Sequence, residues 1–339
     1  MRDDLTLADI ARMAGVSPAT ASRVINNLVG ARSKARDRVL RVIEETGFQP
    51  HAAARSLASQ RSHVIGLLIP APASQVLGHP NVLQLAEVTT QACHEHGYLL
   101  SLFLLGSAAD EQRVLPKVTR KGFVDGLIVR GADDRGSDPL LHRLAALGAP
   151  FVSLGRPADP QRISYVATDN ETAAYGAVTH LLNLGRRRVA LLVGSLEPPH
   201  SQERLSGYRR AHTERALPLD DQLVAVGGMS ESAAATRVLL RHRPDAIFLP
   251  TRVALDVLRV LRDAGLRVPE DIALIGFDDL PLAQQTDPPL TTVGQPMQAM
   301  GRQLVRMLLD QIENPAAPPQ RVVFPQELIV RQSCGALRP

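Results

Sequence analysis

The apolar positions of residues 6–28 repeat with the period of two short helices separated by a tight turn. Thr6 is placed to cap the first helix and Gly15 to end it. Ser17 then caps the second helix, and Pro18 fills its first position, where a missing N–H is tolerated. The predicted inward faces consist of Leu7, Ile10, Ala11 and Ala14, followed by Ala21, Val24, Ile25 and Leu28.

The outward face of the second helix is small, hydroxylic, amide or cationic. Its members are Pro18, Ala19, Thr20, Ser22, Arg23 and Asn26. Such a face can enter a DNA major groove and contact base edges and phosphates. The alternative is an ordinary helical hairpin. We favour DNA reading because the turn, the cap and the outward chemistry agree.

Beyond this hairpin, the pattern predicts a third helix near 34–46, an Ala-rich connector over 50–62, and then alternating strands and helices. Predicted strands lie at 64–69, 98–105, 126–129, 151–154, 165–168, 189–193, 223–226, 246–249, 272–277 and 327–330. Predicted helices lie near 83–96, 140–147, 170–184, 202–215, 231–241, 253–264 and 297–313. This alternation is typical of parallel sheets covered by helices, which bind ligands at the carboxyl ends of their strands.

Length and composition change this picture little. A chain of 339 residues fits two to three domains. It contains no run of eighteen apolar residues, and Asp3, Asp4 and Asp9 stand where a secretory signal would be apolar. We therefore expect a cytoplasmic protein without a membrane span. Cys93 and Cys334 lie far apart and are expected to be reduced thiols.

Charge is unevenly distributed along the chain. Residues 1–62 hold ten Arg and Lys against six Asp and Glu, so the whole formal charge of +4 lies in this segment. A solvated surface would also explain the excess. Beside the predicted helix-turn-helix, we interpret it as an electrostatic footprint for a polyanion.

The motif A-G-V-S-x-x-T-x-S-R-V-I-N, which spans Ala14 to Asn26, resembles the headpiece of LacI/GalR-type transcription regulators. The likeness extends through 39–59 and through the core segments 64–70, 124–129, 167–170, 180–195, 203–211, 266–279 and 288–296. The resemblance implies an all-α helix-turn-helix headpiece and an α/β core of two Rossmann-like lobes, like that of periplasmic binding proteins.

The resemblance also implies domain boundaries. Residues 1–49 would form the headpiece, 50–62 a hinge helix and 63–339 the effector-binding and dimerisation core. The first lobe would comprise 63–162 and 293–322, and the second 163–292 and 323–339, with crossings near 160–165, 290–294 and 320–326. The tail carries no heptads, so we expect a homodimer rather than a coiled-coil tetramer.

By this resemblance the headpiece reads double-stranded DNA at a pseudo-palindromic operator. Arg23 is the candidate for a bidentate contact to guanine, and Pro18 and Ala19 would set operator preference. Thr6, Ser17, Thr20, Ser22 and Asn26 suit phosphates, although capping alone would also explain them. In the hinge, Leu57 would wedge into the minor groove beside Ala54, whereas a flexible linker is the alternative.

The resemblance places the effector in a cleft between the lobes. Arg204 and Asp278 match family residues that contact the effector, and Asp169 also matches the family pattern. His79, Met229 and Thr251 stand where relatives carry aromatic or polar groups. A sugar is the leading effector, and Arg252 leaves an anionic ligand open.

We therefore predict a dimeric transcription regulator, a repressor rather than an activator, that responds to a small molecule, with no cofactor and no metal. Ligand could weaken or strengthen operator binding. The sequence shows no GxSxG, HExxH, Walker A or GxGxxG motif, which argues against an enzyme. A cytoplasmic sugar sensor without a DNA role is the alternative function.

Overall fold

A computed structural model describes residues 5–25, 34–48, 61–73, 76, 80–131 and 138–336. Its contacts divide the chain into two compact units. The first comprises Met1–His63 with Lys121–Phe123, and the second comprises Val64–Arg120 with Val124–Pro339. Each unit is described by itself below.

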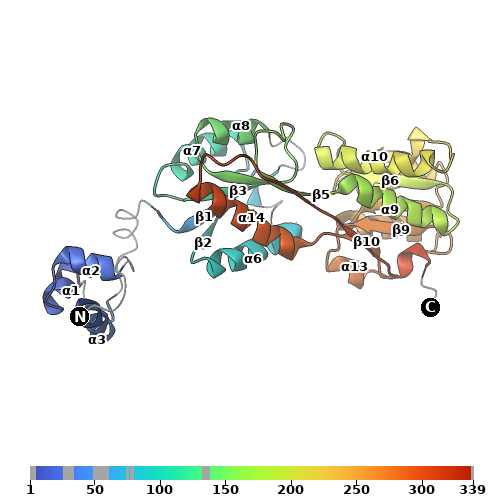
Figure 1. The fold of residues 1–339 in the computed structure, drawn as a ribbon. Coiled ribbons are helices and arrows are strands. Elements are labelled where there is room, and N and C mark those ends of the chain that lie inside the picture. Colours follow the sequence, from blue (N-terminus) through green and yellow to red (C-terminus); the bar gives the residue numbers. More distant parts are fainter. Residues whose placement is uncertain are drawn as a thin grey trace. The chain divides into compact units, whose positions relative to one another are not determined.

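The first unit is a three-helix headpiece formed by α1 (Leu7–Met13), α2 (Pro18–Ile25) and α3 (Lys34–Thr46) (Figure 1). The three helices and the residue that follows α3 share one apolar core. Its buried members are Ile10, Ala11, Ala14, Ala21, Val24, Val39, Val42 and Phe48. Among the described residues, those that the helical pattern placed on the inward faces therefore lie in or against this core.

Local hydrogen bonds set the ends of α1 and α2. The Asp9 N–H donates to Thr6 Oγ1 at 3.3 Å, and the Thr6 N–H donates to Asp9 Oδ2 at 3.0 Å, which makes a capping box. Gly15 has φ of +62°, a conformation that glycine adopts without strain, and it ends the first helix. The Thr20 N–H donates to Ser17 Oγ at 3.2 Å, so Ser17 caps α2.

The first lobe of the second unit is built on a parallel sheet of six strands in the order β11-β5-β4-β3-β1-β2. The strands are β1 (Val64–Ile69), β2 (Leu99–Leu104), β3 (Gly126–Arg130), β4 (Phe151–Leu154), β5 (Tyr165–Thr168) and β11 (Arg321–Phe324). Its helices are α6 (Pro80–Glu95), α7 (Ala108–Val118), α8 (Asp138–Ala146) and α14 (Met297–Glu313).

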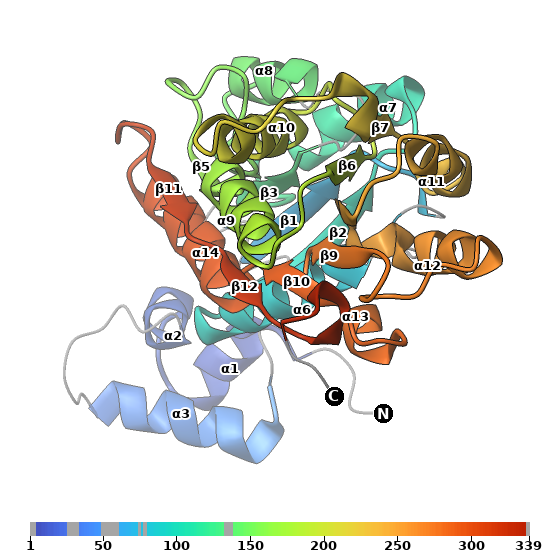
Figure 2. The same cartoon turned by 90° about the vertical axis from the view of Figure 1, so that its right-hand side faces the viewer.

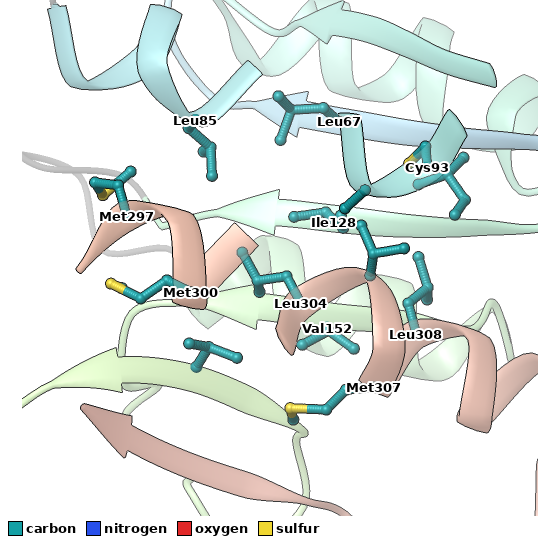
Figure 3. Packing of buried hydrophobic residues seen from close by; sticks show 14 of the residues in the cluster. Leu67, Leu85, Cys93, Ile128, Val152, Met297, Met300, Leu304, Met307 and Leu308 are labelled. Carbon is teal, nitrogen blue, oxygen red and sulfur yellow. The ribbon is translucent and has the colours of Figure 1, made fainter. Parts of the chain in front are cut away.

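Helices cover both faces of this sheet. On one face, Leu85 and Cys93 of α6 pack with Met300 and Leu304 of α14 over Ile128 of β3 (Figure 3). On the other face, α7 and α8 bury apolar side chains against the same strands. The late helix α14 is thus an integral part of the first lobe's core.

The second lobe is built on a sheet in the order β12-β10-β9-β8-β6-β7, in which β12 runs antiparallel to β10. The strands are β6 (Val189–Val193), β7 (Val224–Val226), β8 (Ala246–Pro250), β9 (Ala273–Phe277), β10 (Thr291–Gly294) and β12 (Glu327–Ile329). Its helices are α9 (Asn170–Asn183), α10 (Pro199–Thr213), α11 (Ser232–Leu240), α12 (Ala254–Asp263) and α13 (Leu282–Gln285), with short 3-10 turns Asp221–Leu223, Thr251–Val253 and Gln332–Cys334. Helices α9 and α10 lie side by side on one face, and α11 and α12 cover the other (Figure 2).

The chain passes between the lobes three times. The structure corrects the first two predicted crossing points, whereas the third, between β11 and β12, lies within the predicted 320–326. The first crossing follows β5 at about residue 169 rather than 160–165, because β5 pairs with β4 and β11 in the first sheet. The other crossings lie after β10 and after β11. The predicted lobe limits at 162, 292 and 322 therefore fall before β5, inside β10 and inside β11, since a strand's pattern does not reveal which sheet it joins.

Candidate DNA-reading surface and effector cleft

The predicted DNA-reading residues of α2 lie on its outward side. Ser17, Pro18, Ala19 and Arg23 are exposed, and Thr20 and Ser22 are half-buried. Their helical neighbours Ala21 and Val24 are buried in the headpiece core. The helix therefore presents a cationic and hydroxylic face while its apolar face holds the domain together.

Two of the residues predicted to contact phosphates, Ser17 and Thr6, also form hydrogen bonds within the headpiece. Ser17 Oγ lies 2.9 Å from Thr20 Oγ1 in addition to capping α2. The Thr6 hydroxyl donates to Asp9 Oδ2 at 2.6 Å. These bonds fix both hydroxyls at helix N-termini, where backbone N–H groups and the helix dipole favour anions.

Four predicted site residues lie outside the described residues. They are Asn26, Ala54, Leu57 and His79. Their assigned roles stay predictions.

The second unit contains a cavity of about 180 Å³ at the carboxyl ends of the strands, lined by residues of both lobes. The first lobe contributes Asn81, Arg130, Gly131, Leu154, Gly155, Arg156, Ala167, Thr168, Met297 and Met300. The second lobe and the crossings contribute Asn170, Gly194, Ser195, Pro199, His200, Ser201, Glu203, Arg204, Pro250, Arg252, Asp278 and Gln295. This is the edge at which parallel sheets of this class bind ligands.

An ion pair joins the lobes across this cavity. Arg156 follows β4 of the first lobe, and its Nε lies 2.9 Å from Oε1 of Glu203 on α10 of the second lobe. The second carboxylate oxygen of Glu203 accepts a hydrogen bond of 2.8 Å from Nδ2 of Asn170, the first residue of α9. Glu203 thus contacts both the guanidinium of Arg156 and the amide of Asn170, next to the first crossing between the lobes.

Asp278 is held in the cavity by a strained loop directly after β9. Its φ of +78° is unusual for a residue other than glycine, although Asp and Asn tolerate this region better than most. The Gln295 side chain donates to Oδ1 of Asp278, and the Asp278 N–H donates to the Val293 carbonyl at 3.0 Å. A contact with the crossing segment after β10 therefore fixes the carboxylate, and a contact with β10 itself fixes the backbone.

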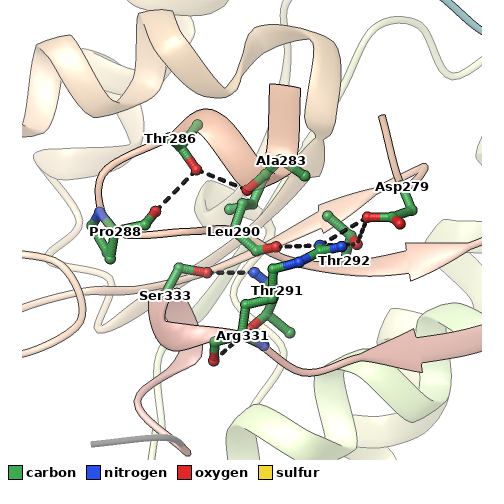
Figure 4. A network of polar contacts seen from close by, with 9 residues as sticks. All are labelled: Asp279, Ala283, Thr286, Pro288, Leu290, Thr291, Thr292, Arg331 and Ser333. Atoms are coloured by element: carbon green, nitrogen blue, oxygen red, sulfur yellow. Dashed lines mark hydrogen bonds and ion pairs between the residues drawn. The ribbon is translucent and has the colours of Figure 1, made fainter. Parts of the chain in front are cut away.

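The next residue, Asp279, is not part of the cavity lining, and its carboxylate contacts Thr292 and Arg331 (Figure 4). Its Oδ1 lies 2.8 Å from Nη1 of Arg331 and accepts a hydrogen bond of 2.7 Å from Thr292 Oγ1. Arg331 also donates to the Leu290 carbonyl at 2.8 Å. This half-buried network ties the loop to β10 and to the C-terminal segment, and so supports the conformation of Asp278.

Packing positions the two arginines of the second lobe. The guanidinium of Arg204 lies 3.5 Å from the ring centroid of Phe277, a cation–π geometry. Arg252 lies against Gly194, where an added Cβ would stand 2.6 Å from Nη2 of Arg252. The glycine after β6 thus leaves room for the guanidinium on the cavity wall.

The structure brings Arg204 and Asp278 to the cavity but not Asp169, Met229 or Thr251. Asp169 is the N-cap of α9 and accepts the Thr172 N–H at 3.0 Å. Met229 lies in the loop before α11 and is 56% exposed. Thr251 is fully buried against Gly276. Family positions placed these three near the site. Capping accounts for Asp169 and core packing for Thr251, whereas Met229 lies at the surface.

Several lining residues escaped the sequence analysis, foremost Arg130, Arg156, Glu203 and Gln295. Asn170, which matches the family pattern together with Asp169, does line the cavity. A positional signal was available for Arg130, because it directly follows the predicted strand 126–129 and so lies at a strand carboxyl end. Among the described residues, no group of three or more His, Cys, Asp or Glu could hold a metal ion.

Known proteins resemble the chain in both units. The model of bacterial regulatory proteins of the lacI family matches residues 6–51, and that of the periplasmic binding protein-like domain matches residues 178–334. The HTH-type transcriptional regulator CelR of Thermobifida fusca is 34% identical over 97% of this chain and 98% of its own length. The HTH-type transcriptional regulator DegA of Bacillus subtilis is 30% identical over 98% of both.

Solved structures agree with these relatives. The complex of the regulator CelR with cellobiose has a TM-score of 0.75 at 32% identity and covers 97% of this chain and 100% of its own. A lac repressor dimer bound to operator and an anti-inducer has a TM-score of 0.81 at 24% identity, covers 98% of this chain and 99% of its own, and shows the shared fold.

A helix-turn-helix headpiece and a two-lobed core of the periplasmic-binding-protein kind define a ligand-binding DNA-binding protein. The chain belongs to the lacI family of bacterial regulatory proteins. It is thus a DNA-binding regulator of transcription, and its relatives are regulators rather than enzymes. Within the part of the chain that the structure describes, no helix is long and apolar enough to cross a membrane.

Proposed function

We propose that this regulator is a repressor whose affinity for its operator is controlled by a small sugar or sugar derivative in the cleft between the lobes. The observation that carries the proposal is the cavity of about 180 Å³, which is lined by Asp278 and Arg204 of one lobe and by Arg156 and Thr168 of the other. Carboxylate and guanidinium groups together suit vicinal hydroxyls.

The names of similar proteins support the choice of a sugar. One solved relative is a CelR complex with cellobiose, and another lacI-family regulator, from Enterococcus faecium, holds bound ribose. The second is 26% identical and covers 81% of this chain and 100% of its own, with a TM-score of 0.68. We extend this class of ligand to the present cavity.

We further propose that the protein acts as a cytoplasmic homodimer on a pseudo-palindromic operator. Arg23 would read a base, with Pro18 and Ala19 beside it, while Thr6, Ser17, Thr20, Ser22 and Asn26 hold phosphates. Two Leu57 side chains would wedge the central step, with Ala54 allowing close approach. In this arrangement a dimer contacts two half-sites about one helical turn apart.

Control would follow from closure of the cleft. A ligand that binds one arrangement of the lobes better than another shifts their equilibrium, and the hinge segments of the dimer then gain or lose their support on DNA. The sign of this coupling decides between an inducer and a corepressor.

An in vitro selection of random duplex DNA on the full-length protein tests the proposal. We expect a two-fold symmetric site with a sharply preferred central step, and sugars are then screened for release of that site. Enrichment of no motif, with or without a metabolite mixture, would contradict sequence-specific regulation and favour a sensor without a DNA role.

The role of Arg23 gives a sharper prediction on the selected site. Arg23→Gln should weaken binding by about 1–3 kcal/mol and relax the preference at one base pair of each half-site. The control is Arg12→Gln on the exposed side of α1, which should weaken binding to all sequences alike. Competition binding against single-base operator variants measures both. An unchanged preference in Arg23→Gln would assign base reading to another residue.

A further inference from the structure

We propose that Arg331 positions Asp278 for the effector, so that the C-terminal segment contributes to ligand affinity without touching the ligand. This inference deepens the proposed function and rests on it, because it takes Asp278 as a group that contacts the effector. Asp278 lines the cavity, whereas Arg331 and its ion-pair partner Asp279 do not. An effect of Arg331 on the ligand therefore passes through the loop that carries both aspartates.

The loop after β9 has a backbone conformation that needs support from its surroundings. Asp278 has φ of +78°, a region that side chains rarely adopt. Such a conformation persists where the surrounding contacts determine it. The Asp278 N–H donates to the Val293 carbonyl, and its carboxylate accepts from Gln295. These two contacts hold the loop at Asp278, and the contacts of Asp279 hold it one residue further on.

A single guanidinium nitrogen provides this second hold (Figure 4). Nη1 of Arg331 lies 2.8 Å from Oδ1 of Asp279. The same nitrogen donates to the Leu290 carbonyl at 2.8 Å and to Thr292 Oγ1 at 3.0 Å. The side chains of Arg331 and Asp279 are 15% and 25% exposed, so water competes weakly for the pair. Without Arg331, the Asp279 carboxylate would lose this ionic partner at a half-buried position and would regain water by turning outward with its loop.

Arg331 is itself held by the strands that frame the loop. Its backbone N–H donates to Thr291 Oγ1 at 2.9 Å, and its carbonyl accepts from the same hydroxyl at 3.1 Å. The buried Ser333 hydroxyl accepts the Thr291 N–H at 2.8 Å and donates to the Leu274 carbonyl at 2.7 Å. The C-terminal segment therefore bonds both to β10 and to β9, the strand that ends directly before Asp278. A guanidinium on a backbone fixed in this way can define the position of the loop.

Hydrogen exchange of the intact, ligand-free protein tests the inference directly. Arg331→Met removes all three contacts of Nη1 but keeps an unbranched side chain. The amides of residues 278–286 should then exchange about tenfold or more faster than in the wild type. Because the three contacts come from one nitrogen, the ammonium of Arg331→Lys can replace it and should restore most of the protection. Unchanged exchange of residues 278–286 in Arg331→Met would overturn the inference.

The matched control is Arg188→Met, because Arg188 also has an ion pair and a contact with a carbonyl group. Its guanidinium lies 3.1 Å from the carboxylate of Asp220 and donates to the His242 carbonyl at 2.7 Å. It directly precedes β6, and the cavity lies at the opposite, carboxyl end of that strand. Arg188→Met should lower the unfolding midpoint, as Arg331→Met does, but should leave the exchange of residues 278–286 unchanged. Equal acceleration in both variants would make Arg331 a merely structural residue and overturn its positioning role.

Ligand binding supplies a second readout. Calorimetric titration with glucose, galactose, ribose and glucuronate identifies a sugar that binds the wild type. Arg331→Met should bind that sugar about tenfold or more weakly, whereas Arg188→Met should bind it as the wild type does. Arg331→Met combined with Asp278→Asn should bind no more weakly than Asp278→Asn alone, because Arg331 acts through Asp278. Additive losses of affinity would contradict that route.

A milder variant keeps the test available if Arg331→Met does not fold. Asp279→Asn retains an acceptor for the Thr292 hydroxyl but loses the ion pair with Arg331. Exchange of residues 278–286 should therefore rise and sugar affinity should fall, in the same directions as in Arg331→Met. Wild-type behaviour of Asp279→Asn in both measurements would overturn the inference.

The two readouts separate this inference from the proposed function. Faster exchange of residues 278–286 in Arg331→Met, with no sugar bound by the wild type, supports the hold of Arg331 on the loop and contradicts a sugar effector. A sugar that changes operator binding equally in the wild type and in Arg331→Met supports the proposed function and overturns the positioning role.

Discussion

The loop after β9 holds Asp278 at φ of +78°, and this conformation predicts how the residue responds to substitution. Asn tolerates the same backbone and accepts the same hydrogen bond from Gln295, so Asp278→Asn should fold. It loses the charge that we propose contacts the effector, and we expect the effector concentration needed to change operator binding to rise about tenfold or more. Fluorescence anisotropy of a labelled operator measures this concentration. The control is Asp263→Asn at the exposed end of α12; equal responses of the two variants would contradict a ligand contact by Asp278.

At the scale of elements, the contact between α9 and α10 depends on Gly207. A Cβ at this position would lie 2.1 Å from the Glu171 carbonyl oxygen and 2.8 Å from the Tyr175 nitrogen. Both are backbone atoms, so Gly207→Ala must push the helices apart and should destabilise the core by about 1–3 kcal/mol. Because α10 carries Glu203 and Arg204, effector affinity should fall as well.

The matched control is Gly176→Ala in α9, where a new Cβ meets nothing within 4 Å. It should raise stability by about 0.5–1 kcal/mol, since glycine is a poor helix former. Thermal unfolding of full-length protein compares the two variants. Equal unfolding midpoints of Gly207→Ala and Gly176→Ala would show that α9 and α10 can move apart without loss of stability.

The capping box of α1 predicts a pH dependence. Hydrogen bonds from the Thr6 side chain and backbone lower the pKa of Asp9 from its ordinary 3.8, with a smaller contribution from Arg12. A carboxyl group whose pKa is lower in the folded than in the unfolded state stabilises the folded state, and this contribution is fully present above the unfolded-state pKa. The contribution is lost as the pH falls through the folded-state pKa. Hydrogen exchange of α1 peptides in the intact protein should therefore speed up below about pH 4 relative to Asp9→Asn. A wild-type to variant ratio that is constant with pH would contradict this.

At the scale of the whole core, the ion pair between Arg156 and Glu203 joins the two lobes across the cleft. The pair is partly exposed, with side chains 40% and 21% accessible, so its contribution should be below about 1 kcal/mol. Arg156→Gln should nevertheless shift the ligand-free lobes toward more open arrangements and raise the radius of gyration in small-angle scattering. Arg259→Gln, which breaks a pair within α12, should leave the scattering unchanged. Identical curves for all three proteins would mean that the pair does not bias closure.

The sequence predicted elements better than it predicted the site. Strands and helices with a clear period were found, whereas α7, the four-residue α13, β10 and β11 were missed. Helix α7 is polar and contains Pro116, which indicates an early helix end. Strand β10 has a single apolar side chain, that of Val293, so its sequence gives no apolar run. Strand β11 lies between Pro319 and Pro325, which are typical of turns.

The cleft was only partly predictable for a different reason. Arg204 and Asp278 followed from family motifs, but the partners of Glu203 come from segments that no local pattern relates to it. Asn170 lies 33 positions away and Arg156 lies in the other lobe. Thr251 shows the converse, because a residue at the matching motif position is buried in the core instead.

The repeated passage of the chain between lobes has a consequence for synthesis on the ribosome. The first lobe begins at β1, yet its core needs Met300, Leu304 and Leu308 of α14. At roughly 5–20 residues per second, a nascent chain that has completed β5 waits roughly 7–30 s for that helix. Strands β6 to β10 of the second sheet are contiguous in translation, and only β12 and the segment around Cys334 join that lobe after α14. Until α14 emerges, the part of the earlier sheet that this helix covers lies open beside α6, and we expect it to be a substrate for chaperones.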